Sequence, residues 1–143
     1  MCIRDRAGLV AVPDDATIIC VHDAARPFAD VALFERAVAA VVAGADGAIP
    51  AIAVTDTIKV VSDGVVVATP DRASLVAVQT PQAFRAQVLR RAHTTADTST
   101  DDAALVEAIG GRVVAVEGDT RNRKITHPDD LEWARRQLET SRP

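Results

Sequence analysis

The sequence predicts an α/β domain in which helices cover both faces of a mostly parallel sheet. Short β-branched apolar runs alternate along the chain with segments whose apolar residues recur at helical spacing. The 143 residues suffice for one domain, and no internal repeat, low-complexity tract or linker divides them. Hydrophobic residues make up 48% of the chain but aromatic residues only 3%, so the core must consist mainly of Ala, Val, Leu and Ile.

Local patterns predict the individual elements. Asp30 is a suitable N-cap for the first long helix, and Pro128 suits the first turn of the last one. Pro50 indicates a bulge or an edge strand, because proline cannot donate to a ladder. The pattern predicts, in order, strand 17–21, helix 31–42, strand 48–54, strands 60–61 and 65–67, strand 75–78, helix 83–93, a helix capped by 100–102, strand 113–116, an extended piece at 122–125 and a helix from 128 to about 138.

A hairpin is predicted around Asp63-Gly64. Valine-rich runs flank this pair on both sides, and an Asp-Gly pair between two β-rich runs is a strong signal for a tight turn between antiparallel strands.

Composition argues against several classes of partner. The formal net charge is −4, and no run of basic residues or aromatic platform indicates binding to a nucleic acid polymer. No apolar stretch approaches the roughly 20 residues of a membrane span. The two cysteines, Cys2 and Cys20, form neither a disulfide framework nor a metal-binding spacing, which is typical of the reducing cytoplasm.

Three polar clusters, at 22–27, 55–59 and 122–126, directly follow predicted strands. Ligands of open α/β sheets bind beyond the carboxyl ends of the strands. Asp23 at such an end can hold Mg²⁺, and Arg26 is suited to bidentate phosphate recognition. Taken singly, Asp23 could be a loop cap, Arg26 half of a surface pair and Lys124 a solvated charge. Their convergence favours a phosphate- or metal-handling domain.

Common nucleotide and hydrolase signatures are absent from the sequence. It contains no G-x-x-x-x-G-K-[ST], no G-x-G-x-x-G after a strand and no G-x-S-x-G. Spacing alone therefore names no substrate.

The polar clusters and their neighbours form an ordered set of strings that resembles one family. The strings are VHDAARP at 21–27, DTIK at 56–59, Arg72, QTPQAF at 79–84, TDDA at 100–103, VEG at 116–118, NRKIT at 122–126 and PDDL at 128–131. This order is similar to that of the 2-C-methyl-D-erythritol 4-phosphate cytidylyltransferases of the non-mevalonate isoprenoid pathway. The resemblance implies a three-layer, Rossmann-like nucleotidyltransferase sandwich with a protruding β-hairpin arm at about 57–72.

The same resemblance implies a transferase reaction and roles for individual residues. The phosphate oxygen of the sugar alcohol attacks the α-phosphorus of CTP, and pyrophosphate leaves. Asp23 would serve Mg²⁺ or another divalent cation and contact the substrate, and Ala24 would back the nucleotide. Arg26 and Thr57 would hold the methylerythritol phosphate, and Arg72 and Thr80 would do so from the neighbouring subunit of a homodimer joined through the arm. Lys124, with Arg72, would orient the attacking phosphate. Asp56, Asp101 and Asn122 match motifs but are weaker candidates for direct contacts.

Two departures from the family pattern lead us to expect an N-terminally truncated, incomplete domain. The family's Gly-rich, basic loop for the CTP triphosphate has no counterpart, and Arg4-Asp5-Arg6 stands where the family has a serine-containing motif. We therefore expect residues 1–6 to be a non-native leader, residues 7–143 to be a partial cytidylyltransferase domain, and the chain to be inactive alone. Two alternatives stay open: a ribitol-5-phosphate cytidylyltransferase, and a non-catalytic dimerising or regulatory domain.

Overall fold

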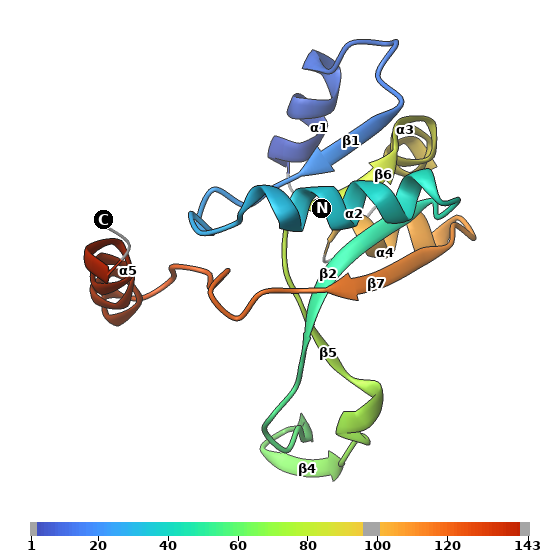
Figure 1. Cartoon of the computed structure of the whole chain (residues 1–143). Helices are drawn as coiled ribbons and strands as arrows, with labels where there is room; N and C mark the ends of the chain where they lie inside the picture. Colours follow the sequence, from blue (N-terminus) through green and yellow to red (C-terminus); the bar gives the residue numbers. More distant parts are fainter. Residues whose placement is uncertain (1–2, 96–100, 141–143) are drawn as a thin grey trace.

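The computed structural model describes residues 3–95 and 101–140 (Figure 1). The elements are α1 (Ile3–Ala11), β1 (Ile18–Val21), α2 (Val31–Val42), β2 (Gly47–Ala53), β3 (Val60–Ser62), β4 (Val65–Ala68), the 3₁₀ turn η1 (Arg72–Ser74), β5 (Val76–Val78), β6 (Gln82–Arg85), α3 (Ala86–Thr95), α4 (Asp102–Ala108), β7 (Val113–Glu117) and α5 (Pro128–Thr140). Asp30 caps α2 as predicted, its side chain accepting the N–H of Leu33. Asp101 caps α4 in the same way through Ala104, while Thr100 lies outside the described residues.

The main sheet is mixed, which corrects the prediction of a mostly parallel sheet. Its strands lie in the order β1-β6-β2-β5, and β7 pairs with the other side of β2. Among the strands of residues 3–95 and 101–140, only the β2–β7 pair of this sheet is parallel, whereas β1–β6, β2–β6 and β2–β5 are antiparallel. The antiparallel strands are β5, which returns from the hairpin, and β6, which the sequence pattern assigned to a helix.

Strand β6 overturns the prediction that a helix begins at residue 83. Ala83 and Phe84 are both fully buried, but they belong to the cores on opposite faces of the sheet. A strand buried on both faces shows no polar alternation, so its sequence can resemble the start of the helix that follows it. Here that helix, α3, begins only at Ala86.

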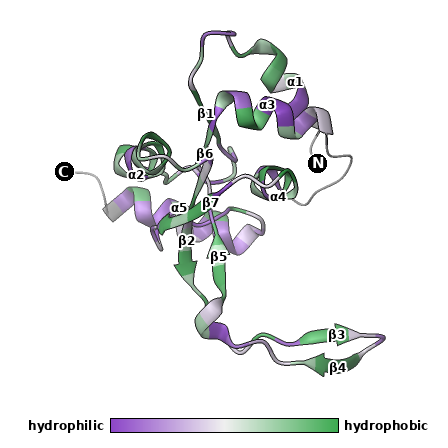
Figure 2. Ribbon diagram, turned by 90° about the vertical axis from the view of Figure 1, so that its right-hand side faces the viewer, coloured by the Kyte–Doolittle hydropathy of each residue, from purple (hydrophilic) through white to green (hydrophobic). Residues whose placement is uncertain are grey.

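Helices cover both faces of the sheet, which confirms the three-layer α/β arrangement. Figure 2 shows α2 on one side of the sheet and α3 and α4 on the other. Ala37 and Val41 of α2 pack on Ala48 and Ala83. The larger core under α3 and α4 contains Phe84, Leu89, Leu105 and Val106 with their neighbours. Small side chains on the α2 face let that helix approach closely, which suits a chain poor in aromatic residues.

The prediction that Pro50 marks an edge strand or a bulge is wrong. Strand β2 is central in the sheet, and its register with β7 runs through Pro50 without a bulge. Pro50 lies where β2 changes partner, between Gly47-Ala48, which pair with β6, and the segment from Ala51 onward, which pairs with β5. Its carbonyl accepts the N–H of Gln79 at 2.7 Å. We infer that a residue without an N–H is tolerated at this change of partner.

Strands β2 and β5 extend away from the body into the predicted hairpin arm (Figures 1 and 2). Strands β3 and β4 form a separate two-stranded sheet. Asp63 and Gly64 at its tip have φ angles of 49° and 78°, as a type I′ turn requires. Every residue of β3 and β4 is exposed, including five valines, at positions 60, 61, 65, 66 and 67.

Three further segments differ from the expectation or extend it. Helix α1 runs without a break through the predicted junction between Arg6 and Ala7. Residues 122–125 form a loop rather than an extended strand. Helix α5 lies apart from the sheet in Figure 1, and the rings of its Trp133 and of Phe28 meet in a T-shaped arrangement with 5.3 Å between centroids. Within the described ranges, no helix has the length and apolar character needed to cross a membrane.

Candidate active site

The loop after β1 is built around the Asp23 carboxylate. The Ala25 N–H donates to Asp23 Oδ1 at 3.0 Å, and the Asp23 N–H donates to Thr80 Oγ1 at 3.0 Å. Thr80 Oγ1 also lies 3.0 Å from Nδ1 of His22. The structure thus joins two of the resembling strings, VHDAARP and QTPQAF, at the carboxyl end of β1. These contacts lie within one chain, which corrects the expectation that Thr80 acts from the neighbouring subunit.

Lys124 brings the third polar cluster to the same place. Its Nζ lies 2.7 Å from Asp23 Oδ2, and the neighbouring Ile125 N–H donates to the Ala25 carbonyl at 2.7 Å. The Lys124 ammonium and the Ala25 N–H hold the pKa of Asp23 below its ordinary value, and burial opposes them. Asp23 is therefore ionised at neutral pH.

Arg26 is partly built into the protein framework. Its guanidinium donates from Nη1 to the Asn122 carbonyl at 2.8 Å and from Nη2 to the Val78 carbonyl at 3.3 Å. Burial lowers the pKa of Arg26, and Asp23 opposes that change. Arg26 thus ties three segments together: its own loop, the end of β5 and the loop after β7.

Thr57 and Arg72 do not join this group. Both are exposed and belong to the arm, where Arg72 Nη1 donates to the Thr55 carbonyl at 2.7 Å. The cluster at 55–59 therefore follows β2 into the arm, away from the other two clusters (Figure 1). Convergence holds for the first and third clusters and not for the second, because the strand that precedes the second extends beyond the body.

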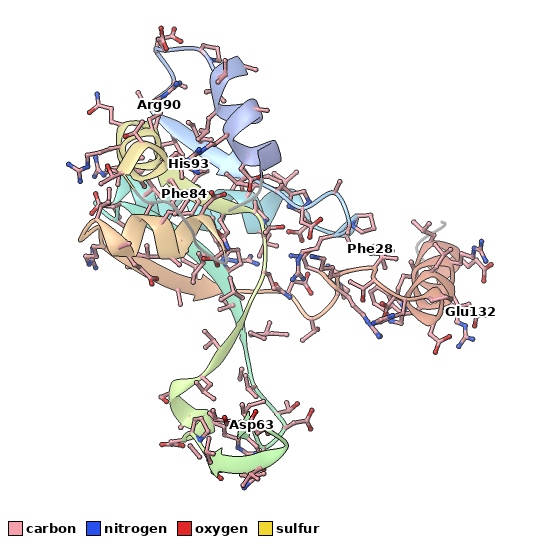
Figure 3. The ribbon with its side chains drawn as sticks, turned by 180° about the vertical axis from the view of Figure 1, so that it is seen from behind. Phe28, Asp63, Phe84, Arg90, His93 and Glu132 are labelled. Atoms are coloured by element: carbon pink, nitrogen blue, oxygen red, sulfur yellow. The ribbon has the colours of Figure 1, made fainter. Side chains whose placement is uncertain are left out.

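The remaining predicted residues lie outside the group formed by Asp23, Arg26 and Lys124. Ala24 is exposed beside Asp23, Asp56 is exposed in the arm, and Asp101 is the α4 cap, whose Oδ2 is 3.4 Å from Gln82 Nε2. A cavity of about 230 Å³ lies between α1 and β1, near His93 in Figure 3. His22 lines it, but Asp23, Arg26 and Lys124 do not, so the group of charges is an open surface rather than part of that cavity.

The side chains at this site could bind Mg²⁺ only together with water and the phosphates of a substrate. Across the parts of the chain that the structure describes, no three His, Cys, Asp or Glu side chains are grouped to hold a metal ion. Mg²⁺ commonly takes one or two carboxylates and completes its shell with water and substrate phosphate. Asp23 fits that pattern, provided that the Lys124 ammonium leaves one of the two carboxylate oxygens of Asp23 for the ion.

Two buried polar residues beneath the site carry more of its structure than the sequence indicated. Gln79 and Asn122 are 4% and 0% exposed, and they link the start of β6 to the loop after β7. Their only signal in the sequence was their place in the QTPQAF and NRKIT strings.

Comparison with known proteins identifies what this arrangement resembles. The family model described as IspD, 2-C-methyl-D-erythritol 4-phosphate cytidylyltransferase, matches residues 5–140. A Rhodococcus jostii protein of the same name is 50% identical over 136 residues, covering 94% of this chain and 60% of the relative. The bifunctional IspD/IspF enzyme of Oleidesulfovibrio alaskensis is 52% identical over 130 residues, covering 87% of this chain and 33% of the relative.

Solved structures agree with the sequence relatives. The Thermus thermophilus 2-C-methyl-D-erythritol 4-phosphate cytidylyltransferase superposes with a TM-score of 0.82 at 35% identity, over 93% of this chain and 66% of that one. The 4-diphosphocytidyl-2C-methyl-D-erythritol synthase of Anaerococcus prevotii gives 0.84 at 30% identity, over 94% and 64%. The present chain thus spans between a third and two thirds of these proteins.

Proposed function

Because this chain belongs to the family of 2-C-methyl-D-erythritol 4-phosphate cytidylyltransferases, we propose that it forms the acceptor half of a site that transfers a cytidylyl group from CTP to 2-C-methyl-D-erythritol 4-phosphate. The observation that carries this proposal is the pairing of Asp23 with Lys124, beside Thr80 and Arg26, at the end of β1. A phosphate oxygen of the acceptor attacks the α-phosphorus of CTP. The bond from that phosphorus to the bridging oxygen breaks, and pyrophosphate leaves with its electron pair.

This reaction requires cationic side chains at the site. Both reactants are anionic, so positioning and charge neutralisation lower the barrier more than covalent chemistry does. Lys124 and Arg72 are the groups we assign to orienting the attacking phosphate, with Arg26, Thr57 and Thr80 holding the acceptor and Ala24 backing the nucleotide. Lys124 is exposed and its ammonium pairs with the Asp23 carboxylate, so a phosphate that binds here can replace that carboxylate as the partner of the ammonium.

Mg²⁺ is the cation we propose for the CTP phosphates, with Asp23 as its protein ligand. When bound, such an ion neutralises phosphate charge and holds the triphosphate in line. Asp23 is suited to this role because the depressed pKa of its carboxyl leaves it ionised at neutral pH.

A homodimer formed through the arm is our proposal for how Arg72 reaches a site. We extend it to Thr57, which was expected to act within its own subunit but lies on the same arm. Both residues lie on the arm with the exposed valines of β3 and β4, and a large exposed apolar patch is typical of a protein interface. In a symmetric dimer each arm would bring these residues to the partner's Asp23 and Lys124.

We place the protein in the cytoplasm, because Cys20 is a free thiol.

A chimera tests the proposed function. Residues 7–143 are joined behind the N-terminal part of the Rhodococcus jostii relative, and pyrophosphate release from CTP, Mg²⁺ and the acceptor is measured. We expect turnover from the chimera and none from the 143-residue chain, because the chain lacks a loop that neutralises the triphosphate. Asp23→Asn in the chimera should lower kcat/KM on the order of a hundredfold.

Control variants and substrates decide between the alternatives. Asp15→Asn changes an exposed aspartate before β1 and should leave the rate unaltered. Faster turnover with ribitol 5-phosphate would assign the acceptor to the other cytidylyltransferase. An inactive, well-folded chimera would instead support the non-catalytic dimerising or regulatory role, and near-normal turnover of Asp23→Asn would remove Asp23 from the site.

A further inference from the structure

The loop that carries Lys124 is held from beneath by the side chain of Gln79. The Gln79 amide pairs with the Asp119 backbone in both directions: Nε2 donates to the Asp119 carbonyl at 2.8 Å, and Oε1 accepts the Asp119 N–H at 3.1 Å. The same Nε2 lies 3.4 Å from the Asn122 carbonyl oxygen. Beyond the end of β7, the buried Gln79 amide thus satisfies the backbone N–H and C=O of Asp119, as a neighbouring strand would.

Asn122 completes the connection to the start of β6. Its Nδ2 donates to the Thr80 carbonyl at 2.8 Å and lies 3.5 Å from Gln79 Oε1. The opposite orientation of the amide would set Oδ1 against the Thr80 carbonyl oxygen, so the hydrogen-bond pattern selects this one. The Asn122 carbonyl in turn receives Nη1 of Arg26 at 2.8 Å.

Gly118 makes room for this arrangement. A Cβ at this position would lie 2.7 Å from Gln79 Oε1 and 2.9 Å from the Ala51 carbonyl oxygen. Its N–H donates to that same Ala51 carbonyl at 2.9 Å. The close approach of the chain at Gly118 therefore brings Asp119 within reach of the Gln79 amide.

We propose that Gln79, acting with Asn122, is a positioning residue that sets where Arg26 and Lys124 stand relative to Asp23 and Thr80. This role deepens the proposed function and rests on it. Gln79 precedes Thr80 directly, so one short segment of chain fixes both the Asp23 backbone, through Thr80 Oγ1, and the loop of Lys124, through the amide. Without that amide, the Asp119 N–H and C=O lose their partner, and the loop is held to the site by fewer hydrogen bonds, those of the Asn122 side chain, Arg26 and the Ala25 carbonyl.

The exchange rate of the Ile125 amide proton, followed by NMR in the 143-residue chain, reports the docking of the Lys124 loop without any substrate, because that N–H donates to the Ala25 carbonyl. Gln79→Met, which keeps the length but loses both hydrogen-bonding atoms, should raise this rate on the order of tenfold while the amides of the main-sheet strands keep their rates. Gln87→Met replaces an exposed glutamine of α3 and should leave the Ile125 rate unchanged.

An unchanged exchange rate of the Ile125 amide in folded Gln79→Met would overturn the positioning role, as would a rise of equal size throughout the main sheet. If Gln79→Met does not fold, the exchange rate of the Ile125 amide is measured in Asn122→Ser by the same criterion. Failure of both variants to fold would show a requirement for folding only and would equally overturn the proposal. Because the readout needs neither CTP nor acceptor, it is independent of whether the chimera turns over.

Discussion

Asp130 shows how a single carboxylate can organise the start of a helix. Its Oδ2 accepts the N–H groups of Thr126 and His127, at 3.0 and 2.9 Å, and the Thr126 hydroxyl at 3.0 Å. Arg123 pairs with the other oxygen and also lies over the Trp133 ring. These hydrogen bonds, with Arg123 adding to them, lower the pKa of Asp130 to about 2. The side chain thus fixes the turn between the Lys124 loop and α5.

The depressed pKa of Asp130 predicts a pH-dependent contribution to stability. A carboxyl whose pKa is lower in the folded state stabilises fully above its unfolded pKa, about 3.9, and loses that contribution as the pH falls toward 2. Asp130→Asn should lower the midpoint of thermal unfolding at pH 7, and the difference from wild type should shrink between pH 4 and pH 2.

Asp129→Asn is the matched control, because Asp129 is the exposed neighbour in the same helical turn. A difference between Asp130→Asn and wild type that stays constant down to pH 2 would show that the hydrogen bonds to Asp130 do not depend on its charge.

The arm is the element whose formation depends most on local sequence. Strands β3 and β4 pair with each other and with no strand of the main sheet. Two-stranded hairpins are marginally stable alone, so the turn at Asp63 and Gly64 contributes a large share of the stability of this pairing. Figure 3 shows Asp63 on the arm, below the body of the molecule.

Gly64→Val should therefore weaken the hairpin. Gly64 has a φ of +78°, and a β-branched residue in that region costs about 1–2 kcal/mol. We expect loss of the cross-strand NMR contacts between Val61 and Val66 with the core resonances unchanged. Asp63→Asn is the control that should preserve the contacts, because Asn tolerates a positive φ. Intact contacts in Gly64→Val would show that the turn does not limit the hairpin.

At the scale of the whole molecule, the separation between the arm and the Asp23 site is the main feature to explain. No hydrogen bond or ion pair among residues 3–95 and 101–140 joins Thr57 or Arg72 to the group of Asp23 and Lys124. The homodimer that we propose would account for this separation, because it would bring Arg72 of one subunit to the Asp23 of the other.

Mixed dimers of the chimera test that sharing. Arg72→Ala and Asp23→Ala should each be nearly inactive alone. In a mixed dimer both defects fall in one site, and the other site is intact. Co-refolding should recover about a quarter of wild-type activity if subunits mix at random and sites act independently.

In the control mixture, Arg72→Ala is co-refolded with Asp15→Ala instead of Asp23→Ala. Its activity should equal the sum of the activities of the two variants measured separately, because Asp15→Ala leaves every site intact. With mixed dimers verified by mass, recovery no greater than the sum of the two variants would reject the assignment of Arg72 to the partner's site.

Local chemistry in the sequence was sufficient to predict much of this molecule. The Asp30 cap, a cap within residues 100–102, the Asp63-Gly64 turn and the strand before His22 depend on neighbours within a few residues. The ordered strings likewise sufficed to indicate the family that the comparisons established. Asp23 and Lys124 were predicted to converge because residues at the carboxyl ends of strands share one edge of a sheet.

Tertiary structure alone decided the direction of the strands, the element at 82–85 and the separation of Arg72 from Asp23. Phe84 packs beneath α3 and α4 while Ala83 packs beneath α2, so two cores on opposite faces, and no local pattern, make that segment a strand. Gln79 and Asn122 gained their importance in the same way, because their partners lie about forty residues away along the chain. Local sequence determines turns and caps through short-range hydrogen bonds, whereas pairing and burial depend on residues that only the folded chain brings together.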